Sequence, residues 1–394
     1  MAPVGSTASG PADKAPLFTT AFLALALSEL AYFTAFGVMV PVVPLYAAEA
    51  LGAGPIGAGL AVGVFSITAL VLRPFAGRMS DRRGRRPLLI TGGLLFTLIT
   101  VAHLVATPLP VLIVLRALLG VAEAMFFVAA GAALTDLAPP DRLGEAVSYI
   151  SLALYLGIAV GPSLGEWWLH LGGYPAAWLG GAGLALVATL LALRIPETAD
   201  LVAGIKSGPL IERSVIGPGL AFFAGLAGAA GFTAFAALHA RNLGMTGSGV
   251  VFAVYGAVVI TGRVLFAKVT DRVPPLRLTA LSLVACALGL GLISALPNPA
   301  GFMIGAGTLA VGVTFLTPAF FRAAMSRVPP DRRGTAIGTA SMFVDTGLGG
   351  GPILLGPIAS AAGIPAAFAA GSALAAVGAV TTTFLRANRR RVKL

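Results

Sequence analysis

The sequence of 394 residues is poor in charge, in cysteine and in histidine. Only 10% of its residues are charged, whereas an ordinary soluble domain has about 25%. The single cysteine, Cys286, excludes a disulfide framework, and the three histidines (His103, His170 and His239) lack metal-ligand spacing. We expect them to be ordinary surface histidines at outer helix ends. No phosphate loop of the GxxxxGKS type and no Ser/His/Asp or Cys/His constellation occurs. These absences argue against an ATP-driven pump or another enzyme, and we expect no cofactor and no metal.

The sequence consists mainly of long apolar runs. Hydrophobic residues make up 57% of the chain and the mean hydropathy is +0.94, so most of the surface is expected to face lipid. A helix that crosses the hydrocarbon core needs roughly 20 predominantly apolar residues. The sequence therefore predicts an all-α membrane protein with twelve transmembrane helices, placed near 17–41, 56–77, 87–106, 110–135, 143–168, 174–195, 215–239, 249–268, 277–296, 300–326, 333–359 and 366–387.

Basic side chains are concentrated in one stretch, GRMSDRRGRRPLL at 77–89, which holds five arginines and one aspartate. A nucleic-acid patch, a solvated loop or a membrane-topology anchor would each explain such a block. If the N-terminus is inside, the outer connections contain one basic residue, Arg241, and the inner segments hold nearly all the others. Basic residues collect on the cytoplasmic side of membrane proteins. We therefore expect no nucleic-acid partner, a multi-pass protein of a bacterial inner membrane, and both termini in the cytoplasm. The first apolar run lacks a basic n-region, so we expect no cleavable signal peptide.

The chain contains an internal repeat with an offset of 190 residues. PPDRLGEAVSYISLALYLGIAVGPSLG begins at 139 and PPDRRGTAIGTASMFVDTGLGGGPILL begins at 329. The same offset carries Arg73 to Arg263 and Asp81 to Asp271. Parallel repeats are a transporter architecture with the binding site between the halves. The predicted domains are a disordered tail (1–16), two pseudo-symmetric six-helix bundles (17–195 and 215–387), a cytoplasmic linker (196–214) and a basic tail (388–394).

Three motifs resemble those of the major facilitator superfamily, and the similarity extends over essentially the whole chain. The loop at 77–86 matches the superfamily's loop signature, RALLGVAEA at 116–124 matches its fourth-span pattern, and GIAVGPSLG at 157–165 matches its fifth-span antiporter pattern. That last pattern usually continues with a second glycine, where this chain has Glu166. The amino-acid sequence around the loop is also similar to that of a bacterial subgroup that includes sugar-efflux-like proteins and the staphylopine exporter. The resemblance implies a drug:proton antiporter-like transporter.

The resemblance implies a cytoplasmic latch, meaning a contact that holds the two halves together at their inner side. Asp81 would dock against the start of the span near 333, where the positive end of a helix dipole favours an acid. Gly84 permits a sharp turn and the arginines anchor the loop to anionic lipid. The alternative is that the block is only a topology signal. The gating residues assigned in this way are Gly77, Asp81, Arg82, Gly84, Arg85, Arg86 and the repeat copy Asp271.

The fifth-span motif predicts close helix packing. Gly157, Gly161 and Gly165 share one helix face and allow another helix to approach, and Pro162 weakens the helix locally. The resemblance implies a seam with the eighth span that seals the outer side. Generic packing without any bearing on transport direction is the alternative.

Charged residues inside a membrane are costly and usually functional. Glu29, Arg116, Glu123 and Asp345 fall within predicted spans, and Arg116 and Glu123 share a face that would allow them to pair. Asp345 is the preferred proton carrier because it replaces Tyr155 of the first half, Glu29 is the next candidate and Glu123 follows it. Arg116 has either a role in coupling or a structural role as the partner of Glu123. Arg73 and Arg263 lie near inner helix ends and are expected to extend toward water.

A small-molecule substrate would need a lined cavity, and aromatic side chains are the candidates for its wall. Helical packing explains each of them as well. The candidates are Tyr32, Phe36, Phe126, Tyr149, Tyr155 and Phe343.

These observations predict a secondary active transporter that works by alternating access. We expect proton-coupled export of a small molecule such as a drug, a metabolite or a metallophore, because burial disfavours the charged form of a carboxyl group and so allows it to take up a proton. A proton-coupled importer of a sugar or other metabolite is the alternative, and a transport-inactive membrane sensor is a third. The expected partners are the substrate, protons and the lipid bilayer, and the chain is expected to be a monomer.

Overall fold

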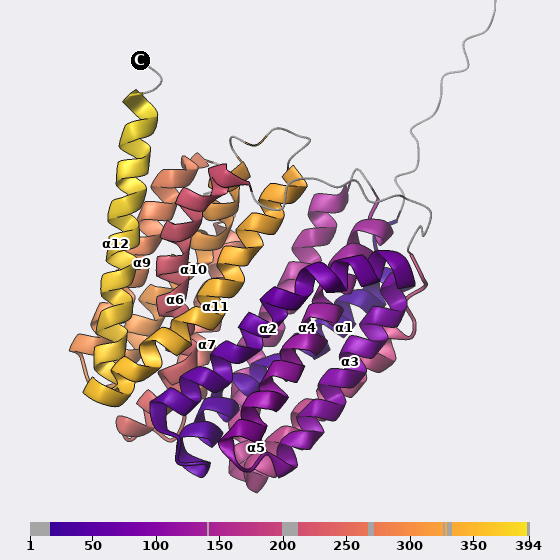
Figure 1. The fold of residues 1–394 in the computed structure, drawn as a ribbon, viewed down its shortest axis with the longest axis horizontal. Coiled ribbons are helices and arrows are strands. Elements are labelled where there is room, and N and C mark those ends of the chain that lie inside the picture. Colours follow the sequence, from indigo (N-terminus) through magenta and orange to yellow (C-terminus); the bar gives the residue numbers. More distant parts are fainter. Residues whose placement is uncertain are drawn as a thin grey trace, which may run out of the picture.

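The computed structural model describes residues 16–139, 142–198, 212–266, 272–325, 328 and 333–391, and within these ranges the secondary structure is entirely helical (Figure 1). The helices are α1 (Thr20–Leu45), η1 (Tyr46–Ala50), α2 (Gly54–Arg83), α3 (Arg85–Ala102), η2 (His103–Val105), α4 (Leu109–Leu137), α5 (Leu143–Ala192), α6 (Arg213–Asn242), α7 (Gly249–Leu265), α9 (Pro275–Ala295), α10 (Pro299–Met325), α11 (Arg333–Ala362) and α12 (Ile364–Arg391).

These helices agree closely with the twelve predicted spans. In the described part of the chain, ten helices are long and apolar enough to cross a membrane, and α7 is a shorter apolar helix. The 50-residue α5 contains two spans, because the backbone leaves helical geometry at Gly172 and at Gly173, where φ is 65°. A positive φ favours glycine, so this pair makes the turn between the fifth and sixth spans. The all-α membrane fold predicted from the sequence is therefore confirmed.

Two helix boundaries lie at residues that are common at helix ends, a glycine with positive φ and a threonine N-cap. Gly84 has φ 100° and separates α2 from α3 within the basic loop. At the start of α1, the Thr19 side chain accepts a hydrogen bond from the Phe22 backbone N–H at 3.2 Å. This N-cap satisfies one of the donors that a helix leaves free at its beginning.

The helices form two groups, called here the N-half (α1 to α5) and the C-half (α6 to α12). Two core clusters lie in the N-half, and a third lies mainly in the C-half and includes Leu45 and Ala58 of the N-half. The N-half core includes the rings of Tyr32 and Phe126, which stack with centroids 3.9 Å apart. The C-half core includes Phe222 and Phe320, stacked at 4.2 Å. Figure 1 shows the indigo-to-magenta helices on one side and the orange-to-yellow helices on the other. Across the boundary, α2 packs on α11, α5 on α7 and α1 on α6.

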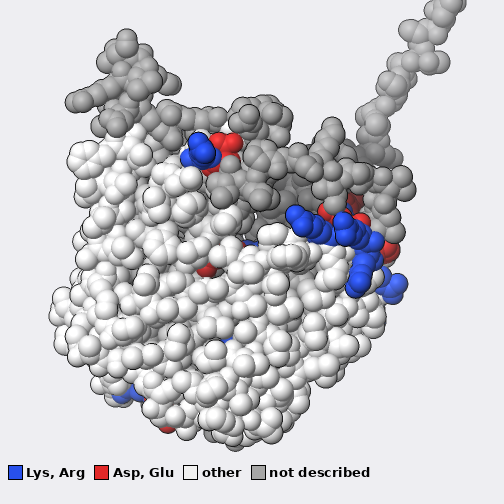
Figure 2. Space-filling view, in the orientation of Figure 1, with Lys and Arg blue, Asp and Glu red and all other residues white. Residues whose placement is uncertain are grey.

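The two ends of the bundle differ in charge. The end that carries the loop between α2 and α3 is called here the basic end, and Figure 2 shows its arginines gathered at the edge of the N-half. The opposite end, which carries η1 and the loop between α6 and α7, is called the far end. Most of the predicted tail 1–16 and linker 196–214 lies outside the described residues, as do the end of the basic tail and Asp271.

Candidate functional site

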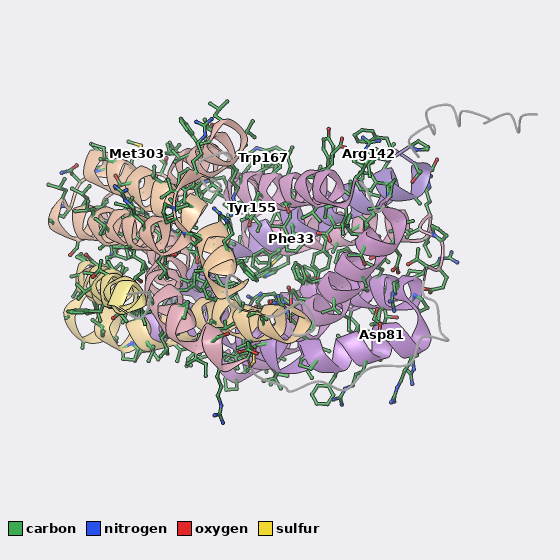
Figure 3. The ribbon with its side chains drawn as sticks, turned by 90° about the horizontal axis from the view of Figure 1, so that it is seen from above. Phe33, Asp81, Arg142, Tyr155, Trp167 and Met303 are labelled. Carbon is green, nitrogen blue, oxygen red and sulfur yellow. The ribbon has the colours of Figure 1, made fainter. Side chains whose placement is uncertain are left out.

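A cavity of about 450 Å³ lies between the two halves and is lined by residues of both. Its wall is mainly apolar and aromatic, and it also contains three arginines and two carboxylates. Figure 3, seen along the bundle, shows Phe33 and Tyr155 near the middle of the molecule, where the halves meet. The charged lining residues are Arg73, Arg116, Glu123, Arg263 and Asp345.

Arg73 is the centre of an ion cluster on this wall. Its guanidinium donates to Asp345 Oδ2 at 2.6 Å and to Glu123 Oε1 at 3.0 Å. The carboxylate side chains are 3% and 7% exposed, and the Arg73 side chain is 21% exposed. The cluster joins α2 and α4 of the N-half to α11 of the C-half. It thus connects the two halves through a pair of buried acids that share one cation.

In the cluster, each buried charge is compensated by a neighbouring charge of opposite sign. Removing one partner of a buried ion pair leaves an uncompensated charge and costs roughly 3–5 kcal/mol. The Arg73 guanidinium also lies over the Phe127 ring, 4.7 Å from its centroid, and the second oxygen of Glu123 has no hydrogen-bond partner among the described residues. The expectation that Arg73 extends toward water at a helix end therefore does not hold in this structure.

Arg116 has different contacts from those expected. Its Nε donates to the Ala61 carbonyl oxygen at 2.8 Å and its guanidinium lies over the Phe65 ring at 4.7 Å. The pairing with Glu123 that the helix face suggested is replaced by the pairing of Glu123 with Arg73. Arg116 is 4% exposed, and its NH1 nitrogen has no partner in the described part of the chain.

Glu29, the second predicted proton carrier, is placed apart from the cavity wall. It is 3% exposed in α1, and its Oε2 atom has no hydrogen-bond partner among the described residues. Asp345 and Glu123 line the cavity, whereas Glu29 is absent from the lining. The structure brings together two of the three predicted acids and adds Arg73 to them.

The predicted cavity aromatics divide into two groups. Phe36 and Tyr155 line the cavity. Tyr32 and Phe126 are fully buried in the N-half core, and Tyr149 is 41% exposed and packs on the Phe18 ring.

Phe343, on α11, packs against the backbone of Gly219 in α6, where a Cβ would collide with its ring. It belongs to the packing of the C-half and does not line the cavity. Three of the six predicted aromatics thus fill helix interfaces and Tyr149 is exposed, because a helical period alone does not tell which face turns to the cavity.

The fifth-span glycines pack against α1. A Cβ placed on Gly161 would lie 2.5 Å from the Thr34 carbonyl oxygen, and one on Gly157 would lie 2.7 Å from the Thr34 backbone nitrogen. Gly165 approaches Val38 in the same way. The predicted close approach is thus present, but its partner is the first span rather than the eighth.

The neighbouring face of α5 meets α7 through Glu166, the residue that departs from the motif. Its buried carboxylate accepts hydrogen bonds from the Ser248 backbone N–H at 2.6 Å, from the Ser248 hydroxyl and from the Gly249 backbone N–H. Gly249 begins α7, so the carboxylate of an N-half residue caps a C-half helix where the dipole favours an anion.

Two further contacts close the far end. Arg241 forms an ion pair with Glu49 of η1, with side chains 46% and 36% exposed. On the other side of the interface, Gly59 and Gly63 of α2 lie so close to the backbone of α11 that a Cβ on either would collide with it. The structure is therefore a conformation that is closed at the far end of the cavity.

The basic loop at the opposite end is held within the N-half. Asp81 is 49% exposed and pairs with Arg85 at 2.8 Å, and Arg85 also pairs with Asp136 at 3.2 Å. Backbone N–H groups of Arg85 and Arg86 donate to Glu197. Figure 3 shows Asp81 well away from the middle of the molecule.

The predicted latch contact runs from Asp81 to the start of the span near 333. Helix α11 begins at Arg333, but residues 329–332 before it lie outside the described residues, as does the repeat copy Asp271. Among the other predicted gating residues, Gly77 is partly buried in α2, and Arg82 and Arg86 are exposed. The latch role of this loop remains a prediction.

Two of the three histidines are buried, which corrects the expectation of surface residues. His103 is fully buried, and its Nδ1 lies 2.8 Å from the Ile99 carbonyl oxygen. His239 is 1% exposed between aromatic rings of the C-half core, and His170 is exposed.

Sequence reasoning missed Arg73, Arg263 and the aromatic residue Phe33 as cavity residues. One signal was available, because the 190-residue offset preserves the arginine as Arg73 and Arg263 inside two otherwise divergent segments. A charge kept in both halves of a membrane protein indicates a position that faces water or a partner.

Known proteins are similar to this chain in sequence over most of its length. The family model of the Major Facilitator Superfamily matches residues 25–352 and again 219–393. The MFS-type transporter YhhS of Escherichia coli strain K12 is 27% identical over 378 residues, with 92% of each chain covered. The MFS-type transporter STM4428 of Salmonella typhimurium is 30% identical over 362 residues, covering 86% of this chain and 88% of the relative.

Solved transporters have the same fold at low identity. A peptide transporter POT in complex with sulfate has a TM-score of 0.81 at 13% identity, covering 95% of this chain and 96% of the other. The nucleoside transporter NupG has a TM-score of 0.75 at 14% identity, covering 92% and 98%. Since the family model extends over most of the chain, this protein belongs to the Major Facilitator Superfamily and is a multi-pass membrane transporter.

Proposed function

We propose that this transporter is a proton-coupled secondary active transporter that works by alternating access. The observation that carries the proposal is the Arg73 cluster, in which two buried acids from different halves share one arginine on the wall of the central cavity. A site that links the halves and can also take up a proton couples protonation to their relative movement.

Asp345 is the proposed proton carrier. Protonation removes the charge that holds Asp345 to Arg73, and Glu123 still balances the arginine after that step. The contact between α2 and α11 is then weakened without leaving a lone buried cation, which would be the more costly outcome.

The direction of transport depends on whether the substrate competes with the proton for the cluster or binds together with it. A substrate that competes with the proton for the cluster would be exchanged, and exchange would give export of a drug, a metabolite or a metallophore. The sequence motifs of the drug:proton antiporter-like subgroup support export. One structural observation supports the second candidate, proton-coupled import: the cavity wall has three arginines against two acids, so a proton and an anionic substrate would favour each other's binding.

The proposed transporter has a defined membrane, orientation and oligomeric state. The charge asymmetry supports an inner-membrane protein with its basic end and both termini in the cytoplasm. The conformation closed at the far end is then closed toward the outside. We propose that the transporter is a monomer, with the N-half and C-half as its two moving bodies.

The proposal is tested in proteoliposomes. Ligands are first found by thermal shift of the purified chain against drugs, sugars and metal–chelator complexes, because bound ligand stabilises the fold. In counterflow and in pH-gradient-driven uptake, Asp345→Asn should retain substrate exchange and lose accumulation. Asp136→Asn is the matched control, since Asp136 pairs with Arg85 at the basic end, outside the cavity. If Asp345→Asn and Glu123→Gln both accumulate substrate as the wild type does, the cluster is not the coupling site.

A further inference from the structure

The two halves carry the same arginine with different surroundings. Arg263 is the copy of Arg73 at the 190-residue offset, and both line the cavity. In the first half, the arginine is neutralised by Asp345 and Glu123.

In the second half, both acids are lost. The offset relates Asp345 to Tyr155 and Glu123 to Val313, and these two residues line the cavity as well. The Arg263 guanidinium lies over the Tyr155 ring, 3.7 Å from its centroid, and its Nε atom has no hydrogen-bond partner among the described residues. The repeat therefore preserves a cation and replaces its counter-ions by an aromatic ring and a valine.

A second arginine with a free donor faces the same cavity. Arg116 is 4% exposed, its NH1 nitrogen has no partner in the described part of the chain, and the acid nearest on its own helix face, Glu123, is taken by Arg73. Seven residues of α-helix span about 10 Å, so Arg116 lies deeper toward the closed far end than the cluster does. A buried guanidinium with an unsatisfied donor is costly unless a ligand completes its hydrogen bonds.

We propose that the substrate of this transporter is an organic anion whose carboxylate binds Arg263, with Arg116 contributing a second positive charge deeper in the same cavity. The inference rests on the proposed function, because it takes the cavity to be the transport site. With both acids ionised, the lining has a net charge of +1, from three arginines and two carboxylates. A guanidinium presents a planar fork of donors that matches a carboxylate.

The rest of the lining specifies the body of the substrate. Aromatic side chains also line this cavity of about 450 Å³, namely those of Phe33, Phe36, Phe65, Phe127 and Tyr255. A small aromatic or alicyclic carboxylate combines a charge for the arginines with a surface for these rings. Since proton uptake by the cluster makes the cavity more positive, an anionic substrate favours the second direction, proton-coupled import.

The test compares three probes of one shape on the purified full-length chain: 2-naphthoate, neutral 2-naphthamide and cationic 2-naphthylmethylammonium. Binding is measured by thermal shift and calorimetry at neutral pH, without any proton gradient. The carboxylate should bind the wild type most tightly. Arg263→Gln and Arg116→Gln should each weaken the carboxylate by about 10- to 100-fold and change the amide little.

Two variants sharpen the comparison. Arg263→Lys keeps the charge without the planar fork and should give an intermediate affinity, and it replaces Arg263→Gln if the latter does not fold. Arg277→Gln removes an exposed arginine outside the cavity and should leave all three affinities unchanged. The proposal is overturned if the amide or the ammonium binds as tightly as the carboxylate, if the carboxylate does not bind at millimolar concentration, or if both cavity variants retain wild-type affinity.

This outcome is independent of the coupling test. Loss of carboxylate binding in Arg263→Gln, together with intact pH-driven accumulation in Asp345→Asn, would support the anion site and refute the proposed proton carrier.

Discussion

Removal of the Glu166 carboxylate should open the far end of the transporter. Glu166 accepts three hydrogen bonds from Ser248 and Gly249 at the start of α7. A hydrogen bond to a charged group contributes about 1.5–3 kcal/mol net of hydration, and the net figure applies because both partners are hydrated when the halves separate. Counting two full bonds at the lower value, Glu166→Ala should shift the equilibrium by about 3 kcal/mol, or about 100-fold, toward the conformation open at the far end.

The shift is measured by double electron–electron resonance in lipid nanodiscs. A spin-label pair at the exposed positions Ala50 and Asn242 reports on the far end, and a pair at Arg83 and Arg272 reports on the basic end. Both pairs are placed in a background with the buried Cys286 replaced by alanine. Glu166→Ala should lengthen the first distance and shorten the second.

The Glu49–Arg241 ion pair provides the matched control. It lies at the same end and also joins the halves, but both side chains are more than one third exposed. Such pairs contribute about 0–1 kcal/mol, so Glu49→Gln should shift the equilibrium by less than about 5-fold. Equal shifts in Glu49→Gln and Glu166→Ala would refute the reasoning. An unchanged distance distribution in Glu166→Ala with a lowered melting temperature would also refute it, since Glu166 would then stabilise both conformations equally.

Three further predictions concern the loop, the glycine seam and the topology. Asp81→Asn should lower the turnover in proteoliposomes more than the substrate affinity, and the reverse pattern would contradict a latch role. Gly161→Ala should lower the stability by about 1–3 kcal/mol, because the added Cβ would lie 2.5 Å from the Thr34 carbonyl oxygen of α1; unchanged thermal unfolding would show that the seam is loose. In intact cells, a cysteine at Asn242 should react with a membrane-impermeant thiol reagent and one at Arg83 should not, and the opposite labelling would invert the topology.

Much of the fold was predictable because it depends on local properties of the chain. The length of each apolar run fixes whether it can span the hydrocarbon core, so all twelve predicted ranges coincide with helical segments. The turn at Gly172 and Gly173 was predicted for the same reason, and the backbone leaves helical geometry at these two residues.

The candidate site was predicted only in part. Asp345 was found because it departs from Tyr155 in the repeat, and Glu123 because it is an acid inside a span. Arg73 was assigned to the membrane surface instead. A position near a helix end has the same sequence signature whether the side chain extends to water or turns to a partner on another helix.

The sequence by itself predicted the apolar spans, the internal repeat and the resemblance to the family, since hydropathy, the 190-residue offset and the motifs are properties of the linear sequence. The tertiary structure decided which charges meet. Arg73 and Asp345 are 272 residues apart, and their 2.6 Å contact exists because α2 and α11 pack together between the halves. In the low dielectric of a membrane protein, that placement determines whether a charge is paired with acids, as Arg73 is, or keeps one nitrogen without a partner among the described residues, as Arg116 does.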